Sequence, residues 1–352
     1  MIAFLAFSFL AGCSIWKHSD VQQQLEGSTM GTTYSIRYCP GEDTPSAITL
    51  QHLIEIELSK VNQQMSTYLK DSEISVFNDA LSSDWVAVST ETAQVIELAQ
   101  SISVTSKGAF DITVGPIVDL WGFGPEKGAE KIPSETELES ARARVGFTQL
   151  EVSLDPPAIK KSNPAVRIDL SAIAKGHGVD RVGSLLANHG IKNYFVEIGG
   201  EIVTRGTRPN AQSWQIGIET PQFGPRSIQS IIGLSDAAIA TSGDYRNYFE
   251  HEGKRYSHTI DPSTGRPITH QLASASVVAD NCALADAIAT CMMVLGPDRG
   301  LALADANEWA VFLIQRNEDS LISSSSSQFE RRFPNVSSRS SIVDQGLAAS
   351  PP

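Results

Sequence analysis

Apolar residues recur at every third or fourth position in several long stretches of the chain, and they alternate or cluster in shorter ones. The longer spacing is typical of helices that pack on one face, and the shorter runs are typical of strands. The pattern predicts helices over residues 47–64, 92–105, 135–145, 173–188, 281–295 and 299–306. It predicts strands over residues 32–39, 166–170, 194–198, 214–219, 228–234, 255–260, 273–278 and 310–315.

These elements alternate irregularly, and some runs of strands have no regular helix between them. Such an order favours an α+β fold with mixed or antiparallel sheets over a doubly wound parallel sheet. Neither an internal repeat nor a long linker interrupts residues 27–333. We therefore expect one compact body over residues 27–333, with helices flanking its sheets.

The two ends differ from this body. Residues 2–11 form an apolar run too short to span a bilayer, and small residues then lead to Cys13. This leader resembles a bacterial lipoprotein signal, which predicts residues 1–13 as a signal ending at a lipidated Cys13 and residues 14–26 as a polar tether. An ordinary signal peptide or a stray cysteine in an apolar leader is the alternative. No Lys or Arg precedes the apolar run, which departs from the usual pattern of such signals and would fit a true start a few residues upstream. Residues 334–352 are rich in Ser and Pro, which predicts a disordered tail.

Composition narrows the class of partner. The chain has 352 residues, of which 41% are hydrophobic, a formal net charge of −13 and a pI near 5.0. This charge argues against a nucleic-acid partner, but not against an anionic small molecule held by local groups and a metal. Cys282 and Cys291 would lie roughly 13 Å apart in one helix, too far for a disulfide, and no zinc pattern is present.

Asp286 and Thr290 form a conspicuous polar pair within the apolar stretch 277–295. Four helical residues separate them, so both lie on one face of the predicted helix. A carboxylate in such surroundings is costly unless it is hydrogen-bonded, neutralised or bound to a cation, and carboxylate and hydroxyl oxygens suit Mg²⁺. A buried Asp that accepts a hydrogen bond from the Thr hydroxyl is the more common arrangement and would give the same pattern.

Three further segments combine glycine with charged or titratable residues. In 108–116, two glycines surround Asp111, a pattern that suits either a backbone close to a ligand or a strand bounded by turns. In 168–178, Asp169 ends a predicted strand and Lys175 follows in the first turns of a helix, where phosphate could bind, although Asp169 could equally be a helix cap. In 256–267, His258 lies among hydroxyl and carboxyl groups. It could act as a base, or it could simply be hydrogen-bonded within a turn.

Together, such segments closely resemble the ApbE family of FAD:protein FMN transferases in order and spacing over residues 27–333. The segments that carry the resemblance are GSTMGT at 27–32, MSTY at 65–68, GAFDIT at 108–113, DLSAIAKG at 169–176, EIGGE at 197–201, SGDY at 242–245, SHTIDP at 257–262, and AD at 285–286 with Thr290. The resemblance implies a single ApbE-like, T-fold-like body with a flavin cleft.

The resemblance also implies an activity and a set of site residues. The expected enzyme is Mg²⁺-dependent, cleaves FAD, attaches FMN through a phosphoester to a threonine of an acceptor protein and releases AMP. The implied acceptors are subunits of Na⁺-translocating NADH:quinone reductase or Rnf-type complexes, and the implied location is the periplasmic face of a bacterial membrane, with a lipid anchor at Cys13. The implied metal ligands are Asp286, Thr290 and the backbone carbonyl of Ala172. The implied flavin contacts are Met30, Tyr68, Ala109, Phe110, Asp111, Asp169 and Lys175.

A base is needed to take the proton of the acceptor threonine, which is a poor nucleophile at neutral pH. We expect His258 to act with Asp261 or a water, and Tyr68 or Phe110 to stack on an aromatic ring of FAD unless both belong to the core. Many relatives carry a second Asp where this chain has Ala289, which favours a single Mg²⁺. A Mg²⁺-dependent FAD pyrophosphatase and a non-catalytic FAD-binding lipoprotein are the alternatives.

Overall fold

The computed structural model describes residues 22–124, 132–222, 227–244, 248–318, 320–336 and 341–342. The predicted signal, its Cys13, residues 14–21 of the predicted tether and most of the predicted tail lie outside these ranges. No helix among the described residues is long and apolar enough to cross a bilayer.

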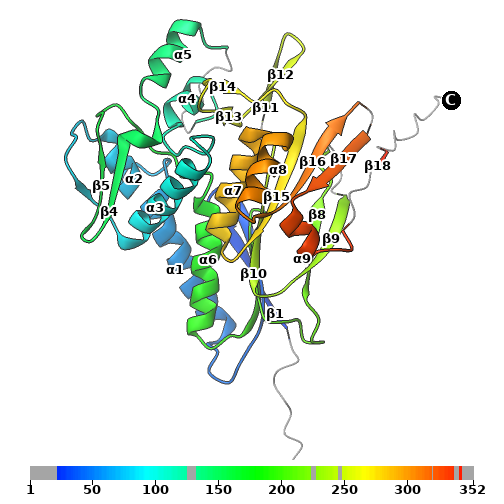
Figure 1. The fold of residues 1–352 in the computed structure, drawn as a ribbon. Helices are drawn as coiled ribbons and strands as arrows, with labels where there is room; N and C mark the ends of the chain where they lie inside the picture. Colours follow the sequence, from blue (N-terminus) through cyan, green and yellow to red (C-terminus); the bar gives the residue numbers. More distant parts are fainter. Residues whose placement is uncertain are drawn as a thin grey trace, which may run out of the picture.

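A large antiparallel sheet runs through the centre of the molecule (Figure 1). Nine strands of the described residues form it, in the order β1-β2-β6-β7-β10-β15-β16-β17-β18, and every pairing between neighbours is antiparallel. The strands are β1 (Gln23–Thr29), β2 (Thr32–Cys39), β6 (Asn193–Ile198), β7 (Glu201–Arg205), β10 (Ala237–Gly243), β15 (Leu272–Ala279), β16 (Ala310–Asn317), β17 (Ser320–Ser325) and β18 (Ser341–Ile342).

Both faces of the central strands are covered, which explains why strands such as β15 and β16 carry apolar residues on both faces. Successive side chains point to opposite faces, so Val311 and Leu313 of β16 enter the helix-covered core while Phe312 and Ile314 enter a second core. That second core lies between the sheet, the hairpin of β8 (Trp214–Glu219) and β9 (Ile228–Leu234), and helix α9 (Ser327–Arg332).

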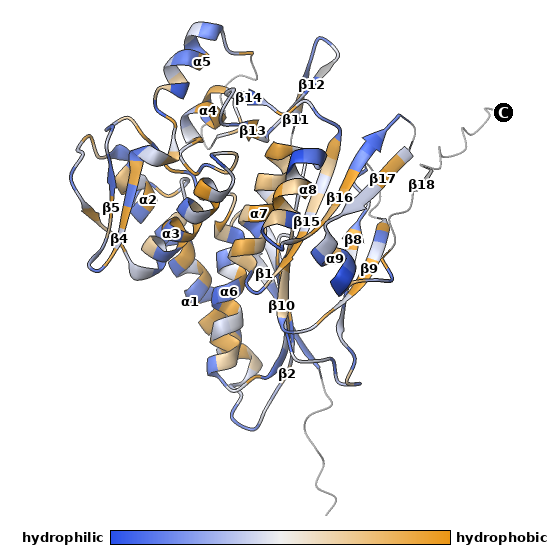
Figure 2. Ribbon diagram, in the orientation of Figure 1, coloured by the Kyte–Doolittle hydropathy of each residue, from blue (hydrophilic) through white to orange (hydrophobic). Residues whose placement is uncertain are grey.

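Helix α7 (Cys282–Leu295) lies against β10 and β15 and is buried between the sheet and other helices. Its all-round burial explains its composition, because a helix without a solvent face needs no polar stripe. Figure 2 shows α7 as hydrophobic over most of its length. The remaining helices are α1 (Ala47–Met65), α2 (Glu73–Asp79), α3 (Thr90–Thr105), α4 (Gly115–Leu120), α5 (Glu135–Arg142), α6 (Ala174–Asn188) and α8 (Pro297–Ala306).

Small sheets and a short 3-10 turn complete the described fold. They are β3 (Val86–Ala87), β5 (Pro157–Lys161) and β4 (Leu150–Leu154) in one sheet, β11 (Tyr248–His251) with β12 (Lys254–Ser257), β13 (Ile260–Asp261) with β14 (Arg266–Pro267), and the 3-10 turn Phe147–Gln149. The α+β class with one body and a large antiparallel sheet is therefore confirmed.

The predicted strand over residues 166–170 is wrong, because this segment pairs with no strand. The backbone groups at its centre bond to a side chain: the Asn78 amide donates to Ile168 O (2.8 Å) and accepts from Ile168 N (2.7 Å). Asp169 N donates to the backbone oxygen of Ile112 (2.8 Å), which lies in no strand. The buried Lys161 ammonium donates to Val166 O (3.1 Å) and also to Phe77 O (3.0 Å) at the end of α2. Burial lowers the pKa of Lys161.

Other predicted boundaries need correction. The strand predicted over 255–260 is interrupted after Ser257, where His258 and Thr259 leave the hairpin before β13. The helix predicted over 135–145 ends at Arg142. Strand β1 begins at Gln23, before the predicted start of the body, and β18 lies within the predicted tail.

Candidate active site

A cavity of about 480 Å³ opens where the ends of α6, α7 and β10 meet several loops. Its lining includes residues 109–112, Asp169, Ser171, Ala172 and Lys175, residues 241–243, residues 258–260, and side chains of α7. This volume is typical of small-molecule sites. The predicted site residues that line it are Tyr68, Ala109, Phe110, Asp111, Asp169, Ala172, Lys175, His258, Asp286 and Thr290.

Asp286 is a buried carboxylate of this cavity, with 2% of its surface exposed. The Gly176 amide of α6 donates to Asp286 Oδ2 (3.0 Å), and the Thr290 hydroxyl pairs with Ser242 Oγ (3.2 Å). The start of α7 is fixed by Asp180 of α6, whose carboxylate accepts hydrogen bonds from Cys282 N (2.8 Å) and Ala283 N (2.9 Å). Burial nevertheless raises the pKa of Asp180 to about 6.

Lys175 lies between two buried carboxylates. Its Nζ is 2.5 Å from Glu201 Oε1 and 3.8 Å from Asp286 Oδ1. Burial opposes the charged ammonium, but the carboxylates of Asp286 and Glu201 outweigh burial and raise the pKa of Lys175 above its ordinary value. For Glu201, burial outweighs the opposing effect of Lys175 and raises the pKa to about 7.

The oxygen donors of the cavity fit Mg²⁺. Asp286 Oδ1, the Thr290 hydroxyl and Ala172 belong to the same lining. The described residues contain no group of three or more His, Cys, Asp or Glu side chains that could hold a metal. Three protein oxygens would leave the other positions of an octahedral ion to other ligands. Mg²⁺ usually takes one or two protein carboxylates and keeps waters or phosphate oxygens at its remaining positions. Ala289 is fully buried in the core and does not line the cavity.

Residues 30–313 match the ApbE family. The chain belongs to the ApbE family. A Vibrio cholerae serotype O1 protein named FAD:protein FMN transferase is 46% identical over 330 residues, which cover 94% of this chain and 97% of that relative. A Haemophilus influenzae protein of the same name is 44% identical over 312 residues, 87% of this chain and 90% of the relative. The solved structure of flavin transferase ApbE from Vibrio cholerae has a TM-score of 0.82 and 46% identity, and the match covers 89% of this chain and 99% of that one.

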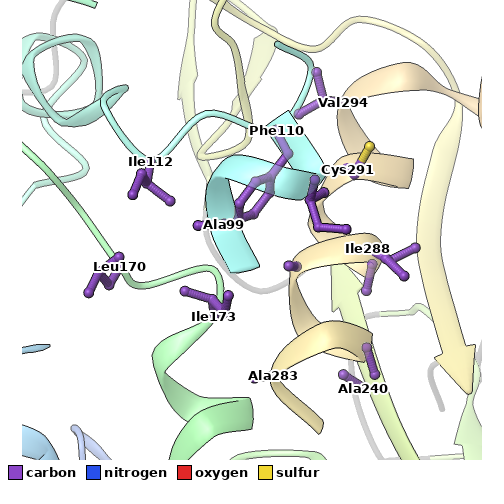
Figure 3. Close-up of a cluster of buried hydrophobic side chains, with 14 of the residues drawn as sticks. Ala99, Phe110, Ile112, Leu170, Ile173, Ala240, Ala283, Ile288, Cys291 and Val294 are labelled. Carbon is purple, nitrogen blue, oxygen red and sulfur yellow. The ribbon is translucent and has the colours of Figure 1, made fainter. Parts of the chain in front are cut away.

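The ApbE resemblance assigns two aromatic residues to the flavin, and the structure separates them. Phe110 is 2% exposed and packs in the helix-covered core with Ala99, Cys291 and Val294 (Figure 3). Tyr68 lines the cavity but is 71% exposed, so its ring is available to a ligand. Tyr68 is therefore the better candidate for stacking.

Two acidic residues of the ApbE motifs have local partners. Asp111 Oδ1 accepts hydrogen bonds from Thr113 N and Thr113 Oγ1, and its Oδ2 accepts from Phe147 N. Burial raises the pKa of Asp111. Asp169 Oδ1 accepts from Ser171 N (2.8 Å) and does not cap α6, which begins at Ala174. These carboxylates shape the loops that line the cavity.

Three further residues named in the sequence analysis have other partners in the structure. Met30 does not line the cavity, and its side chain lies beside Gly178 on α6, where an added Cβ would be 2.9 Å from Met30 Cε. The Gly176 amide at the start of α6 is already bonded to Asp286 and is not available to phosphate. Asp261 does not line the cavity, and its Oδ1 accepts from Ser263 N (2.8 Å) and Ser263 Oγ (2.7 Å).

His258 lies just beyond β12, where the chain turns into the cavity. Its ring meets Phe123 edge to face, with the ring centroids 6.3 Å apart. Two residues of the cavity escaped the sequence-based assignment: Glu201 and Ser242 both belong to ApbE motifs, but their importance comes from contacts with Lys175 and Thr290. The signal that could have found Glu201 is an acidic residue directly before the apolar pair Ile202 and Val203 of a strand.

Proposed function

We propose that this protein is a Mg²⁺-dependent FAD:protein FMN transferase that joins FMN to a threonine of an acceptor protein and releases AMP. The observation that carries the proposal is the buried Asp286, which lies with Thr290 and Lys175 in one cavity of ligand size. The names of the relatives support the same reaction. A non-catalytic FAD carrier would not need a buried carboxylate and a hydroxyl in the part of the cavity where Lys175 would meet the phosphates.

The reaction exchanges the phosphoanhydride bond of FAD for a phosphoester bond to threonine. The threonine Oγ attacks the FMN-side phosphorus of FAD, a P–O bond forms, the P–O bond to AMP breaks, and AMP leaves with the bridging oxygen. Mg²⁺ held by Asp286, Thr290 and the Ala172 carbonyl would act as a Lewis acid on the diphosphate. We assign to His258 the removal of the threonine proton, and to Lys175 a positive charge close to the phosphates.

Replacing His258 with alanine should slow FMN transfer by about 100- to 10,000-fold, because general-base catalysis contributes that much. FAD affinity should stay near the wild-type value, since the proposed role concerns only the threonine proton. The measurement is single-turnover transfer to an acceptor domain, together with FAD binding by fluorescence. His251→Ala is the matched control, because His251 is an exposed histidine on the neighbouring strand β11. Normal FAD binding with a wild-type rate in His258→Ala would rule out the base.

Replacing Tyr68 with alanine should raise the KM for FAD by about three- to tenfold through the loss of aromatic stacking. Because Tyr68 is 71% exposed, the free energy of unfolding should change by less than about 0.5 kcal/mol. Steady-state kinetics and thermal unfolding measure the two effects. Tyr68→Phe keeps the ring and should behave like the wild type. An unchanged KM in Tyr68→Ala would show that the ring does not contact FAD.

One assay separates the proposed transferase from its alternatives. The full chain is incubated with FAD, Mg²⁺ and a threonine-containing acceptor domain, and a denaturing gel is then viewed for flavin fluorescence. A fluorescent acceptor band that requires Mg²⁺ and the threonine supports the transferase. Free FMN and AMP without a labelled band indicate a pyrophosphatase, and unchanged FAD indicates a carrier.

We further propose that the enzyme acts at the periplasmic face of a bacterial membrane, anchored by a lipid on Cys13. The leader sequence is the support for this location, and it lies outside the described residues. The proposed acceptors, subunits of Na⁺-translocating NADH:quinone reductase or Rnf-type complexes, rest on the family resemblance. A mature protein whose N-terminus is not a lipid-modified Cys13 in mass spectrometry would contradict the anchor.

A further inference from the structure

Two buried carboxylates compete for one ammonium group in the cavity. Glu201 and Asp286 are each 2% exposed, and the Lys175 side chain lies between them. Its Nζ is in direct contact with Glu201 Oε1 at 2.5 Å but is 3.8 Å from Asp286 Oδ1. The lysine is therefore paired with Glu201, and Asp286 Oδ1 has no direct hydrogen bond from it.

The second oxygen of Asp286 is also fixed. Gly176 N donates to Asp286 Oδ2 (3.0 Å), and this backbone bond sets the direction of the carboxylate. Asp286 Oδ1 is then the oxygen left for a cation in the cavity. A lysine ammonium that moved the short remaining distance to Oδ1 would occupy that oxygen and repel a divalent cation.

Glu201 is badly placed to bind the cation itself. Its Oε1 is occupied by Lys175. Its Oε2 is buried and has no hydrogen-bond partner among the described residues, and it lies 3.4 Å from the position that a Cβ on Gly199 would take. A buried oxygen that faces the backbone at Gly199 is poorly placed to bind an ion in the cavity.

We propose that Glu201 is a positioning residue that holds Lys175 away from Asp286 and so keeps Asp286 Oδ1 available to Mg²⁺. The inference rests on the proposed function, because it concerns the metal used there. Glu201 thereby acts on metal affinity through Lys175 and not by coordination. Lys175 in turn stays beside the metal position, where its charge faces the phosphates of the substrate.

The test measures metal binding without turnover. Mn²⁺ binding to the full chain is followed by electron paramagnetic resonance, and Mg²⁺ binding by calorimetry, in wild type, Glu201→Asp, Lys175→Met and the double variant. Glu201→Asp keeps the charge but shortens the side chain, so Lys175 is released towards Asp286. We expect its dissociation constant to rise about tenfold, a coupling typical of contacting residues.

The Lys175→Met background decides how Glu201 acts. With no lysine to compete for Asp286, Glu201→Asp should change the dissociation constant by less than about twofold. An equal loss in both backgrounds would overturn the proposal and make Glu201 a ligand. No loss of affinity in either background would also overturn the proposal, because it would show that a carboxylate charge at position 201 is enough and that its exact position does not matter. Glu91→Gln is the control, because Glu91 pairs with Lys60 (2.6 Å) and does not line the cavity.

The same measurement separates this inference from the proposed function. If the wild-type protein binds neither Mn²⁺ nor Mg²⁺, the metal-dependent function fails before Glu201 is considered. If the wild type binds metal and Glu201→Asp binds it equally well, only the positioning role fails. Unfolding curves for each variant confirm that the compared proteins are folded.

Discussion

Asp286→Asn should lower Mg²⁺-dependent FMN transfer by about a thousandfold or more, because a bound cation contributes several kcal/mol to such reactions. Asp286 is the buried carboxylate at the proposed metal position, and an amide is a much weaker ligand for a hard cation. The asparagine can still accept the hydrogen bond from Gly176 N, so the contact between α6 and α7 is kept. Transfer rates over a range of Mg²⁺ concentrations measure the effect.

The matched control is Asp298→Asn on α8, an exposed acidic residue in the first turn of a neighbouring helix. It should leave both the rate and its Mg²⁺ dependence unchanged. Asp286→Asn should retain part of its FAD affinity, since the loops and Tyr68 remain. Full Mg²⁺-dependent activity in Asp286→Asn would remove the case for a metal at this position.

Gly176→Ala should lower the free energy of unfolding by about 3 kcal/mol, the scale of overpacking in a close backbone contact. A Cβ on Gly176 would lie 2.3 Å from Cys282 O and 2.8 Å from Ala283 Cα, so α6 and α7 would have to separate. Backbone atoms cannot rotate away as a flexible side chain can. The shift would also displace Gly176 N from Asp286, so metal binding should weaken together with stability.

Gly300→Ala on α8 is the control for this variant. Its Cβ would meet the flexible Met292 side chain at 3.2 Å, and replacing glycine with alanine in a helix gains up to about 1 kcal/mol. Urea unfolding of both variants gives the comparison. A Gly176→Ala protein as stable as the wild type would show that α6 and α7 can separate at little cost.

The helices and strands predicted best are those that are determined by the residue pattern of their own segment. Strands β2, β8 and β9 have the predicted bounds, and α1, α3, α6 and α7 differ from prediction by one or two residues. Each has a clear apolar period or a clear N-cap, such as Ser46 and Asn281. The segment over 166–170 was misassigned because its apolar residues look like a strand, whereas its bonding partners lie far away in the chain. No local pattern reveals such partners.

The site residues divide in the same way, into those set by local spacing and those set by contacts between distant segments. Asp286 and Thr290 were found from helical spacing alone, because both lie on one helix. The link between Lys175 and Glu201 could not be predicted in this way, since it depends on how α6 packs beside β7. Likewise, Phe110 and Tyr68 look alike as aromatic residues of motifs, and only burial separates a core side chain from one available to a ligand.

The loop that carries Asp169 and Ala172 owes its place to Asn78, whose amide binds the backbone of Ile168 across 90 residues of sequence. A neighbouring strand would hold this loop whatever its side chains were, because backbone bonds survive substitution. Here the contact at Ile168 depends on a single side-chain amide. It is supplemented by Lys161 and by one backbone bond, from Asp169 N to Ile112 O (2.8 Å). Asn78 and Lys161 do not line the cavity. Substitutions at these two residues should nevertheless displace the loop that carries Asp169 and Ala172.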